Sequence, residues 1–333
     1  MSFDFASVKF EEVTCLICKS NDHIEKLFIA KDLLCGLPGE FNVVKCLGCG
    51  LVFQNPRPQE QFIGNYYPDD LGYFNTQNEN GGISFLSKKI LTNFYAYTNL
   101  GKKKIVEKIL LFPLYIYLYK HRSIPQYRKN GTLLEIGCSD GLALKKLQEL
   151  GWQTKGIEMN SKAARYARDS RDLDVESGAV SNFKFKPESF DVIILDMVLE
   201  HLYNPDKTMK EIISWLKKDG ELIFSIPYFG GLEFKVFKQY SYGLQLPTHI
   251  TFFNKNSLYH ILKGFQKIHF SFHHFDRDVV ASAQYRYDAR GSILDKFIAT
   301  NKLFRILIIK PSVFILSLLG KTSRVTVFAR KQS

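Results

Sequence analysis

The run Leu133-Leu134-Glu135-Ile136-Gly137-Cys138-Ser139-Asp140-Gly141 constrains the fold of this chain more than any other segment. Its apolar start predicts a buried strand, and Gly137, Ser139 and Gly141 predict a tight turn before a helix that begins near Leu142. A helix N-terminus presents unpaired N–H groups, and small residues let a ligand approach the backbone. The run therefore predicts a ligand-binding strand–turn–helix unit.

Further apolar runs follow, each separated from the last by a stretch long enough for a helix. They are Lys155–Glu158, Phe190–Leu195 and Glu221–Ile226. Strands that alternate with helices predict an α/β fold with a doubly wound, mostly parallel sheet. Gln266–His274 and Arg324–Arg330 alternate polar and apolar residues, which predicts two closing strands.

Two acids decide which ligand the turn suits. A nicotinamide-binding loop has the same glycine outline, so the glycines alone discriminate weakly. Glu135 lies two residues before Gly137, where a dinucleotide fold continues with apolar residues, and an acid there suits a ligand with an ammonium and a sulfonium better than a diphosphate. Glu158 ends the next predicted strand, where a carboxylate can accept hydrogen bonds from both ribose hydroxyls.

These residues resemble the first motif of class I S-adenosylmethionine-dependent methyltransferases, acid-x-Gly-x-Gly-x-Gly, with Ser139 in place of the middle glycine. Ser189–Leu195, Val198–Leu202 and Trp215–Leu222 are similar to later motifs of that family, in the same order. The resemblance implies a Rossmann-like, seven-stranded sheet and S-adenosylmethionine as cofactor. A Rossmann-like scaffold that binds no nucleotide is the alternative.

The resemblance also implies a set of cofactor-binding residues. Gly178 and Ala179 would lie beside the adenine, and Asp196 near the methionine end, while Cys138 is a small packed residue of the loop. The full set is Glu135, Gly137, Cys138, Ser139, Gly141, Glu158, Met159, Ala179 and Asp196.

The N-terminal segment holds two CxxC pairs, Cys15/Cys18 and Cys46/Cys49. Two such pairs supply four thiolates in a tetrahedral array, as in a zinc ribbon, and leave no ligand position for water, so the predicted zinc is structural. Because nothing at the N-terminus reads as a secretory signal, we expect a cytoplasmic chain with reduced cysteines. A disulfide arrangement is the alternative, and Cys35 is an odd thiol.

The cysteine module followed by Leu51–Pro58 and Tyr66-Tyr67-Pro68 resembles bacterial methyltransferases of sugar and cell-surface polysaccharide pathways. On this basis we divide the chain into four parts. They are a zinc-binding module (1–60), a helical linker or cap (61–130), the S-adenosylmethionine-binding core (131–280), and a helical insertion with a closing strand (281–333).

Two histidines are candidates for the general base that an acceptor hydroxyl requires. His249 follows the fifth predicted strand, where this fold places acceptor-binding loops, and His201 follows the fourth. Sugar C-methyltransferases read Tyr-x-Glu-His in the similar segment, whereas this chain has Leu246 and Thr248 in place of Tyr and Glu. A sugar hydroxyl is therefore the favoured acceptor, and a purely structural role is the alternative for either histidine.

Positive charge is concentrated in the flanks. Residues 61–130 hold 10 basic and 4 acidic side chains and residues 281–333 hold 10 and 2, whereas residues 131–280 hold 19 of each. We expect a helix in Ile83–Tyr127 that Pro113 interrupts or divides. The apolar runs Ile109–Tyr119 and Leu303–Leu319 are too short or too interrupted to span a membrane.

We therefore predict methyl transfer to a hydroxyl of a nucleotide- or lipid-linked sugar. The basic flanks predict a peripheral contact at the inner face of the membrane, with packing against the sheet or another protomer as the alternative. Nucleic acid is disfavoured because the cysteine module is not basic and the Asn/Asp-Pro-Pro-Tyr motif of amino-methylases is missing. RNA methylation, sugar C-methylation and a non-catalytic cofactor-binding module remain as alternatives, and the oligomeric state stays open.

Overall fold

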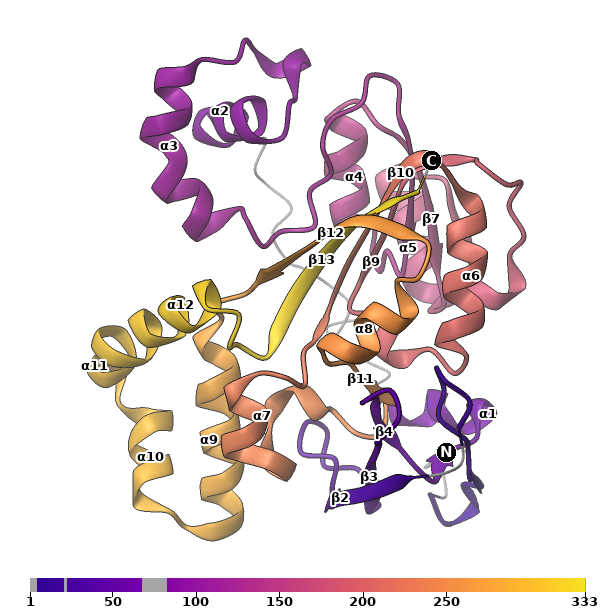
Figure 1. Cartoon of the computed structure of the whole chain (residues 1–333), viewed down its shortest axis with the longest axis vertical. Coiled ribbons are helices and arrows are strands. Elements are labelled where there is room, and N and C mark those ends of the chain that lie inside the picture. The colour runs from indigo at the N-terminus through magenta and orange to yellow at the C-terminus, as the bar shows by residue number, and fades with distance from the viewer. Residues whose placement is uncertain (1–4, 21–22, 68–82, 333) are drawn as a thin grey trace.

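The computed structural model describes residues 5–20, 23–67 and 83–332, and its largest element is a seven-stranded sheet (Figure 1). The strand order is β12-β13-β10-β9-β6-β7-β8. All neighbours from β10 to β8 are parallel, and β13 runs antiparallel to both of its neighbours. The strands are β6 (Thr132–Ile136), β7 (Gln153–Glu158), β8 (Val175–Ser177), β9 (Phe190–Asp196), β10 (Leu216–Pro227), β12 (Phe265–Phe272) and β13 (Arg324–Lys331). The predicted α/β class and both closing strands are confirmed.

Apolar side chains cover both faces of this sheet, because successive residues of a strand point to opposite faces. Leu133 packs with one buried cluster and Leu134 with the other. One face is covered by α4 (Leu142–Glu149), α5 (Ser161–Arg171) and α2 (Phe85–Phe94), and the other by α6 (Pro205–Trp215) and α8 (Lys255–Ile261). The carboxyl ends of the parallel strands therefore meet at one edge, where ligands bind in such folds.

The N-terminal module has its own sheet, with strand order β11-β4-β3-β2. Its strands are β2 (Ile24–Ala30), β3 (Phe41–Cys46), β4 (Val52–Gln54) and β11 (Thr251–Phe252). β11 comes from the segment after β10, so this sheet joins two parts of the chain that lie far apart in sequence. The short strands β1 (Phe10–Glu11) and β5 (Arg57–Pro58) pair antiparallel beside it. Cys15, Cys46 and Phe53 belong to the same buried cluster as α6 and α8, so the module is continuous with the main core.

The helical flanks lie to the side of the sheet in Figure 1. The expectation that Pro113 interrupts the first flank is wrong: α3 (Ile105–Leu118) runs through Pro113 as one helix. The break comes earlier, between α2 and α3, where η4 (Thr98–Leu100) ends at Gly101. The C-terminal flank consists of α9 (Asp276–Arg290), α10 (Ile293–Thr300), α11 (Lys302–Phe304), the π-helical η9 (Arg305–Ile309) and α12 (Lys310–Leu318).

The remaining helical elements are short. They are α1 (Glu60–Ile63), α7 (Leu232–Phe237), η1 (Phe5–Ser7), η2 (Gly64–Tyr66), η5 (Val180–Asn182), η6 (Leu199–His201), η7 (Lys238–Tyr240) and η8 (Tyr242–Leu244). The run Asn75–Gly82, whose polar residues and paired glycines predict a linker or exposed loop, lies outside the described residues. None of the helices in the described ranges combines the length and the apolar character needed to cross a bilayer.

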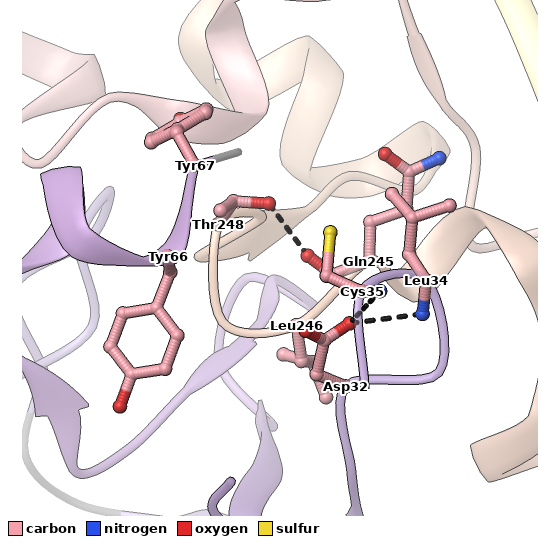
Figure 2. A pocket seen from close by; sticks show the side chains of 8 residues that line it. All are labelled: Asp32, Leu34, Cys35, Tyr66, Tyr67, Gln245, Leu246 and Thr248. Carbon is pink, nitrogen blue, oxygen red and sulfur yellow. Dashed lines mark hydrogen bonds between the residues drawn. The ribbon is translucent and has the colours of Figure 1, made fainter. Parts of the chain in front are cut away.

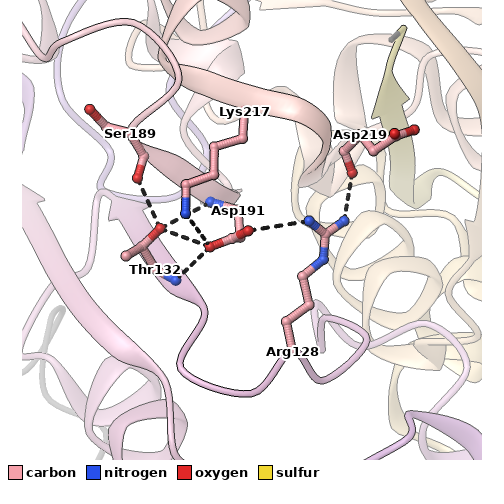
Figure 3. Close-up of polar contacts among 6 residues, drawn as sticks. All are labelled: Arg128, Thr132, Ser189, Asp191, Lys217 and Asp219. Carbon is pink, nitrogen blue, oxygen red and sulfur yellow. Dashed lines mark hydrogen bonds and ion pairs between the residues drawn. The ribbon is translucent and has the colours of Figure 1, made fainter.

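A polar network ties the strands together at the edge opposite their carboxyl ends (Figure 3). The Asp191 carboxylate accepts hydrogen bonds from Lys217 (2.7 Å) and from the Thr132 backbone N–H (2.9 Å), and Arg128 lies 3.3 Å away. Burial favours a raised pKa for Asp191, but the bonds from Lys217 and Thr132 outweigh it and hold the pKa below its usual value. This network fixes where β6, β9 and β10 begin.

Candidate functional site

The glycine turn between β6 and α4 has a strained backbone. Gly137 (φ 75°), Ser139 (φ 51°) and Gly141 (φ 78°) all have positive φ, a conformation that costs a residue with a side chain. A Cβ on Gly137 would collide with Val198, and a Cβ on Gly141 would lie 2.5 Å from Leu173. Close packing therefore requires glycine at both positions. Ser139 has the same positive φ, although its side chain makes that conformation costly.

Glu158, at the end of β7, holds this turn in place. One carboxylate oxygen accepts the Ser139 N–H (2.8 Å) and the other accepts the Asn160 N–H (2.7 Å). Burial raises the pKa of Glu158, and these N–H groups offset part of the rise. The carboxylate is oriented toward the turn, where a ribose would lie in a class I methyltransferase.

Glu135 is buried beside the turn, and its Oε2 has no hydrogen-bond partner among the described residues. Burial, together with the nearby negative charges of Asp196, Glu158 and Asp140, raises its pKa to about 8. An unpartnered acid among other acids stabilises a positively charged ligand and destabilises a phosphate. The turn and its acids therefore fit S-adenosylmethionine, whose sulfonium and ammonium are cationic, better than a dinucleotide.

The other predicted cofactor residues surround the same turn. Cys138 is buried, and burial raises the pKa of its thiol well above the usual range, which excludes a thiolate nucleophile at neutral pH. Met159 is 57% exposed directly after β7, and Ala179 follows β8. Asp196, at the end of β9, has an exposed side chain, and desolvation by neighbouring protein raises its pKa.

The four predicted metal ligands converge in the N-terminal module. The Sγ atoms of Cys15 and Cys49 lie 3.4 Å apart, and those of Cys18 and Cys46 lie 3.5 Å apart. These separations are too long for a disulfide and close to the roughly 3.8 Å that Zn–S bonds of about 2.3 Å give in a tetrahedron. The hydrogen bond between the Cys15 and Cys49 thiols, in which either sulfur can donate, lowers the pKa of Cys15 to about 5 and raises that of Cys49. The donor set fits zinc, whereas Cys35 lies outside it.

The two candidate histidines are neighbours, with ring centroids 4.7 Å apart. His201 Nδ1 lies 2.8 Å from the Thr248 carbonyl oxygen and 2.9 Å from the Tyr67 hydroxyl, and His249 Nδ1 lies 3.0 Å from the Gly243 carbonyl oxygen. A carbonyl only accepts, so each Nδ1 carries a proton and each lone pair is on Nε2. Burial lowers the pKa of His201 to about 4 and that of His249 well below its usual value, so both rings are neutral at pH 7.

A small pocket opens beside His201 (Figure 2). It brings together the loop after β2, the segment after α1 and the loop before β11. Its lining is Asp32, Leu34, Cys35, Tyr66, Tyr67, Gln245, Leu246 and Thr248. The Asp32 carboxylate accepts hydrogen bonds from backbone N–H groups of its own loop. It therefore holds the shape of the pocket wall. The space within it is about 10 Å³, roughly what one water molecule needs, so the pocket is a small hollow.

The structure separates Tyr66 and Tyr67, two neighbours that the sequence singles out together. Tyr66 packs edge-on against Phe5 and Phe41 and is a core residue, whereas Tyr67 contacts His201. Two other positions, Gln245 and Asp140, were missed. Gln245 lines the pocket without belonging to any motif, because only folding brings its loop to the cysteine module. Asp140 receives two bonds from Arg171 of α5, and its place inside the glycine run was the one signal available.

Comparisons with known proteins agree with this geometry. Residues 115–267 match the model of a family described as a methyltransferase domain. The ubiquinone biosynthesis O-methyltransferase of Idiomarina loihiensis is 29% identical over 99 residues, which cover 28% of this chain and 41% of that protein. The enzyme of the same name from Pelagibacter ubique is 32% identical over 106 residues, which cover 31% of this chain and 44% of the relative. The chain thus spans less than half the length of these two relatives.

A solved S-adenosylmethionine-dependent methyltransferase from Mesorhizobium loti covers 61% of this chain and 92% of its own, with 13% identity and a TM-score of 0.40. The family match, which includes the glycine turn and its acids, is the comparison that bears on the site. Residues 115–267 are therefore similar to a methyltransferase domain, and this part of the chain includes the turn and the acids that fit S-adenosylmethionine.

Proposed function

We propose that this protein transfers the methyl group of S-adenosylmethionine to a hydroxyl of a nucleotide- or lipid-linked sugar. The observation that supports S-adenosylmethionine as methyl donor is the acid-lined turn, where Glu135 Oε2 has no hydrogen-bond partner in the described part of the chain and Glu158 points at the backbone of Ser139. When bound, the donor supplies an electrophilic methyl carbon. The acceptor oxygen forms a bond to this carbon as the carbon–sulfur bond breaks, and the electron pair of that bond stays on sulfur.

The role of the chain is to align the two reactants and to keep water away, because the displacement is in line. The pocket beside Tyr67 lies next to η6, which follows the Asp196 end of β9, so acceptor and donor share one edge of the sheet. His201, at the end of η6, and the neighbouring His249 are the groups that we assign to promote loss of the hydroxyl proton. Both are neutral with a lone pair on Nε2, and the Tyr67 hydroxyl connects His201 to the pocket.

The sugar acceptor is supported by the form of the pocket. An aromatic ring (Tyr67), an amide (Gln245) and a hydroxyl (Thr248) around a small volume are the groups that position a polar ring. The resemblance of the cysteine module to sugar and polysaccharide methyltransferases points the same way. We propose that zinc in the Cys15–Cys18–Cys46–Cys49 cluster is structural and holds one wall of this pocket.

Two measurements test the proposal. Calorimetry should show binding of S-adenosylmethionine and of its demethylated product, and Glu158→Ala should weaken both by about 10- to 100-fold, since it removes a charge-assisted hydrogen-bond acceptor. Glu176→Ala, on the adjacent strand β8, is the control and should bind normally. Binding of NAD in place of the methyl donor would overturn the assignment.

The acceptor is tested by transfer of a labelled methyl group. We expect label in nucleotide-linked or lipid-linked sugars, with Gln245→Ala raising KM more than it lowers kcat. Label that appears only in RNA would contradict the sugar acceptor while leaving the methyl donor in place.

A further inference from the structure

The two histidines share their surroundings with a buried acid, Glu200. Glu200 is 0% exposed, and neither carboxylate oxygen has a hydrogen-bond partner among the described residues. One such oxygen and one ring nitrogen from each of His201 and His249 lie within 4.8 Å of one another. A buried carboxylate without a hydrogen bond is costly, so this arrangement calls for a missing partner.

The histidines are oriented as metal ligands are. A ligating histidine normally donates its second ring N–H to a carbonyl or carboxylate, which fixes the tautomer and the ring plane. Both rings do so here: His201 toward the Thr248 carbonyl and His249 toward the Gly243 carbonyl. The lone pairs on Nε2 are left for another group.

We propose that Glu200, His201 and His249 bind a divalent transition-metal ion, as a second metal site separate from the four cysteines. Two imidazoles and one carboxylate form a known catalytic zinc set, which leaves a coordination position open. In a tetrahedron, bonds of about 2.1 Å place the ligand atoms roughly 3.4 Å apart, so ligand atoms spaced up to 4.8 Å have to approach one another by at most about 1.4 Å through side-chain rotation.

The surrounding charges are compatible with a cation. Arg324 acts on both Glu200 and His249, but its guanidinium lies 3.3 Å from the Asp278 carboxylate, which compensates its charge. Asp196 adds a further negative charge near Glu200. Glu200 therefore provides the charge that a divalent ion needs, and Asp278 balances the nearby arginine.

The proposal deepens the function proposed above, since a cation at this place would lower the pKa of an acceptor hydroxyl in the role given to the histidines. Metal binding itself does not depend on that function. Failure of the cation site would leave methyl-donor binding at Glu135 and Glu158 untouched, so the two proposals are separable by calorimetry.

The test is the metal content of the purified full-length chain. After equilibration with zinc and removal of free metal, we expect two equivalents of zinc per chain. Cobalt substitution separates the two sites, because only the cysteine site gives an intense sulfur-to-cobalt charge-transfer band. The second cobalt should appear through d–d absorption without that band.

Glu200→Gln keeps the shape of the side chain and removes its charge, and we expect it to weaken the second site at least 10-fold without changing the first. Glu233→Gln is the control: Glu233 is also buried, but it is bonded to Ser323. One equivalent of metal in the unaltered chain, or an unchanged second equivalent in Glu200→Gln, would overturn the proposal. Because the unaltered chain is itself decisive, a variant that fails to fold does not obscure the result.

Discussion

Burial makes the ionised form of Glu135 costly in the folded protein. It is buried with one unpartnered oxygen, and burial together with nearby acids raises its pKa to about 8. An isolated scaffold gains nothing from such a group, whereas a site for a cationic ligand does. The acid is therefore best understood as a binding residue that the core tolerates.

This assignment makes a prediction about pH. Because the pKa of Glu135 is higher in the folded state than in the unfolded chain, ionisation favours unfolding, and stability should fall as pH rises from about 5 to 8. Glu135→Gln should remove this fall and raise the unfolding free energy by about 2–4 kcal/mol at pH 9, with little effect at pH 4. Urea denaturation at both pH values measures the difference.

The same variant should bind S-adenosylmethionine more weakly, because it lacks the charge. A Glu135→Gln chain that is more stable and binds the cofactor normally would show that the acid has no role in binding. Gain of stability with loss of affinity is the expected pair of outcomes.

At the scale of elements, one network supports the beginnings of three strands. Asp191 connects Thr132 of β6 with Lys217 of β10 and with Arg128, which precedes the sheet (Figure 3). The site lies at the other ends of the same strands. The network that stabilises the sheet and the candidate site therefore lie at opposite edges of the sheet.

Asp191→Asn should accordingly reduce stability without changing catalysis. We expect a loss of about 1–3 kcal/mol at pH 7, since charge-assisted bonds to Lys217 and Arg128 are lost. The folded-state pKa of Asp191 is depressed below the ordinary 3.8, so its contribution is present above that value and disappears as pH falls through the folded pKa. Unfolding curves of the two proteins should converge near pH 2, and cofactor affinity at pH 7 should be equal.

The cysteine module gives a second prediction at this scale. Cys46 ends β3, which pairs with β4, and β4 pairs with β11 after the fifth parallel strand. Loss of zinc should therefore loosen the acceptor-side loop as well as the module. Cys46→Ser should lose the zinc of the cysteine site and at least about 2 kcal/mol of unfolding free energy.

Metal analysis and calorimetric unfolding measure these two effects. Cys35→Ser is the matched control, because Cys35 lies outside the metal cluster although it lines the pocket. If Cys46→Ser kept its full zinc content and stability, the cysteines would not be ligands.

At the scale of the whole molecule, the flanking helices leave large apolar surfaces uncovered. On α3, Ile105, Ile109 and Leu110 are each more than two-thirds exposed, and α10 to α12 expose a second group. This group comprises Ile293, Leu294, Phe297, Leu303, Ile306, Leu307, Ile308, Ile315, Leu318 and Leu319. Monomers that stay in water rarely expose such continuous surfaces.

The charges of the C-terminal flank favour an anionic bilayer as the partner that covers these apolar surfaces. Between Ile293 and Lys321 the one acid, Asp295, is paired with Arg286, whereas Lys296, Lys302 and Lys310 carry positive charge. An apolar helical surface with basic residues binds at a lipid interface. The resulting position would bring a lipid-linked acceptor to the protein.

We expect the protein to sediment with vesicles that contain phosphatidylglycerol at low salt, and several-fold less with phosphatidylcholine alone. Ile306→Asp combined with Leu307→Asp should reduce sedimentation several-fold, while Ile29→Asp in β2, also exposed, should not. A chain that stays in solution and elutes as a dimer would instead assign these surfaces to protein–protein contact.

The sequence by itself determined the parts that depend on local chemistry. The alternation of apolar runs predicted β6, β7, β9 and β10, because burial on both faces leaves continuous apolar strands. The glycines and acids at Glu135–Gly141 predicted the turn, and two CxxC pairs predicted a cluster of four thiols. Each of these signals lies within a few residues of chain.

Only the tertiary structure decided what long-range packing brings together. Glu200, His201 and His249 converge because β11 joins the N-terminal sheet, and the pocket at Tyr67 and Gln245 forms from the same pairing. Pro113 stays inside a helix although its ring removes one backbone hydrogen bond, and neighbouring packing of Leu111, Leu114 and Tyr115 compensates. Such contacts form where segments far apart in sequence pack against each other. No local pattern in the sequence determines which segments these are.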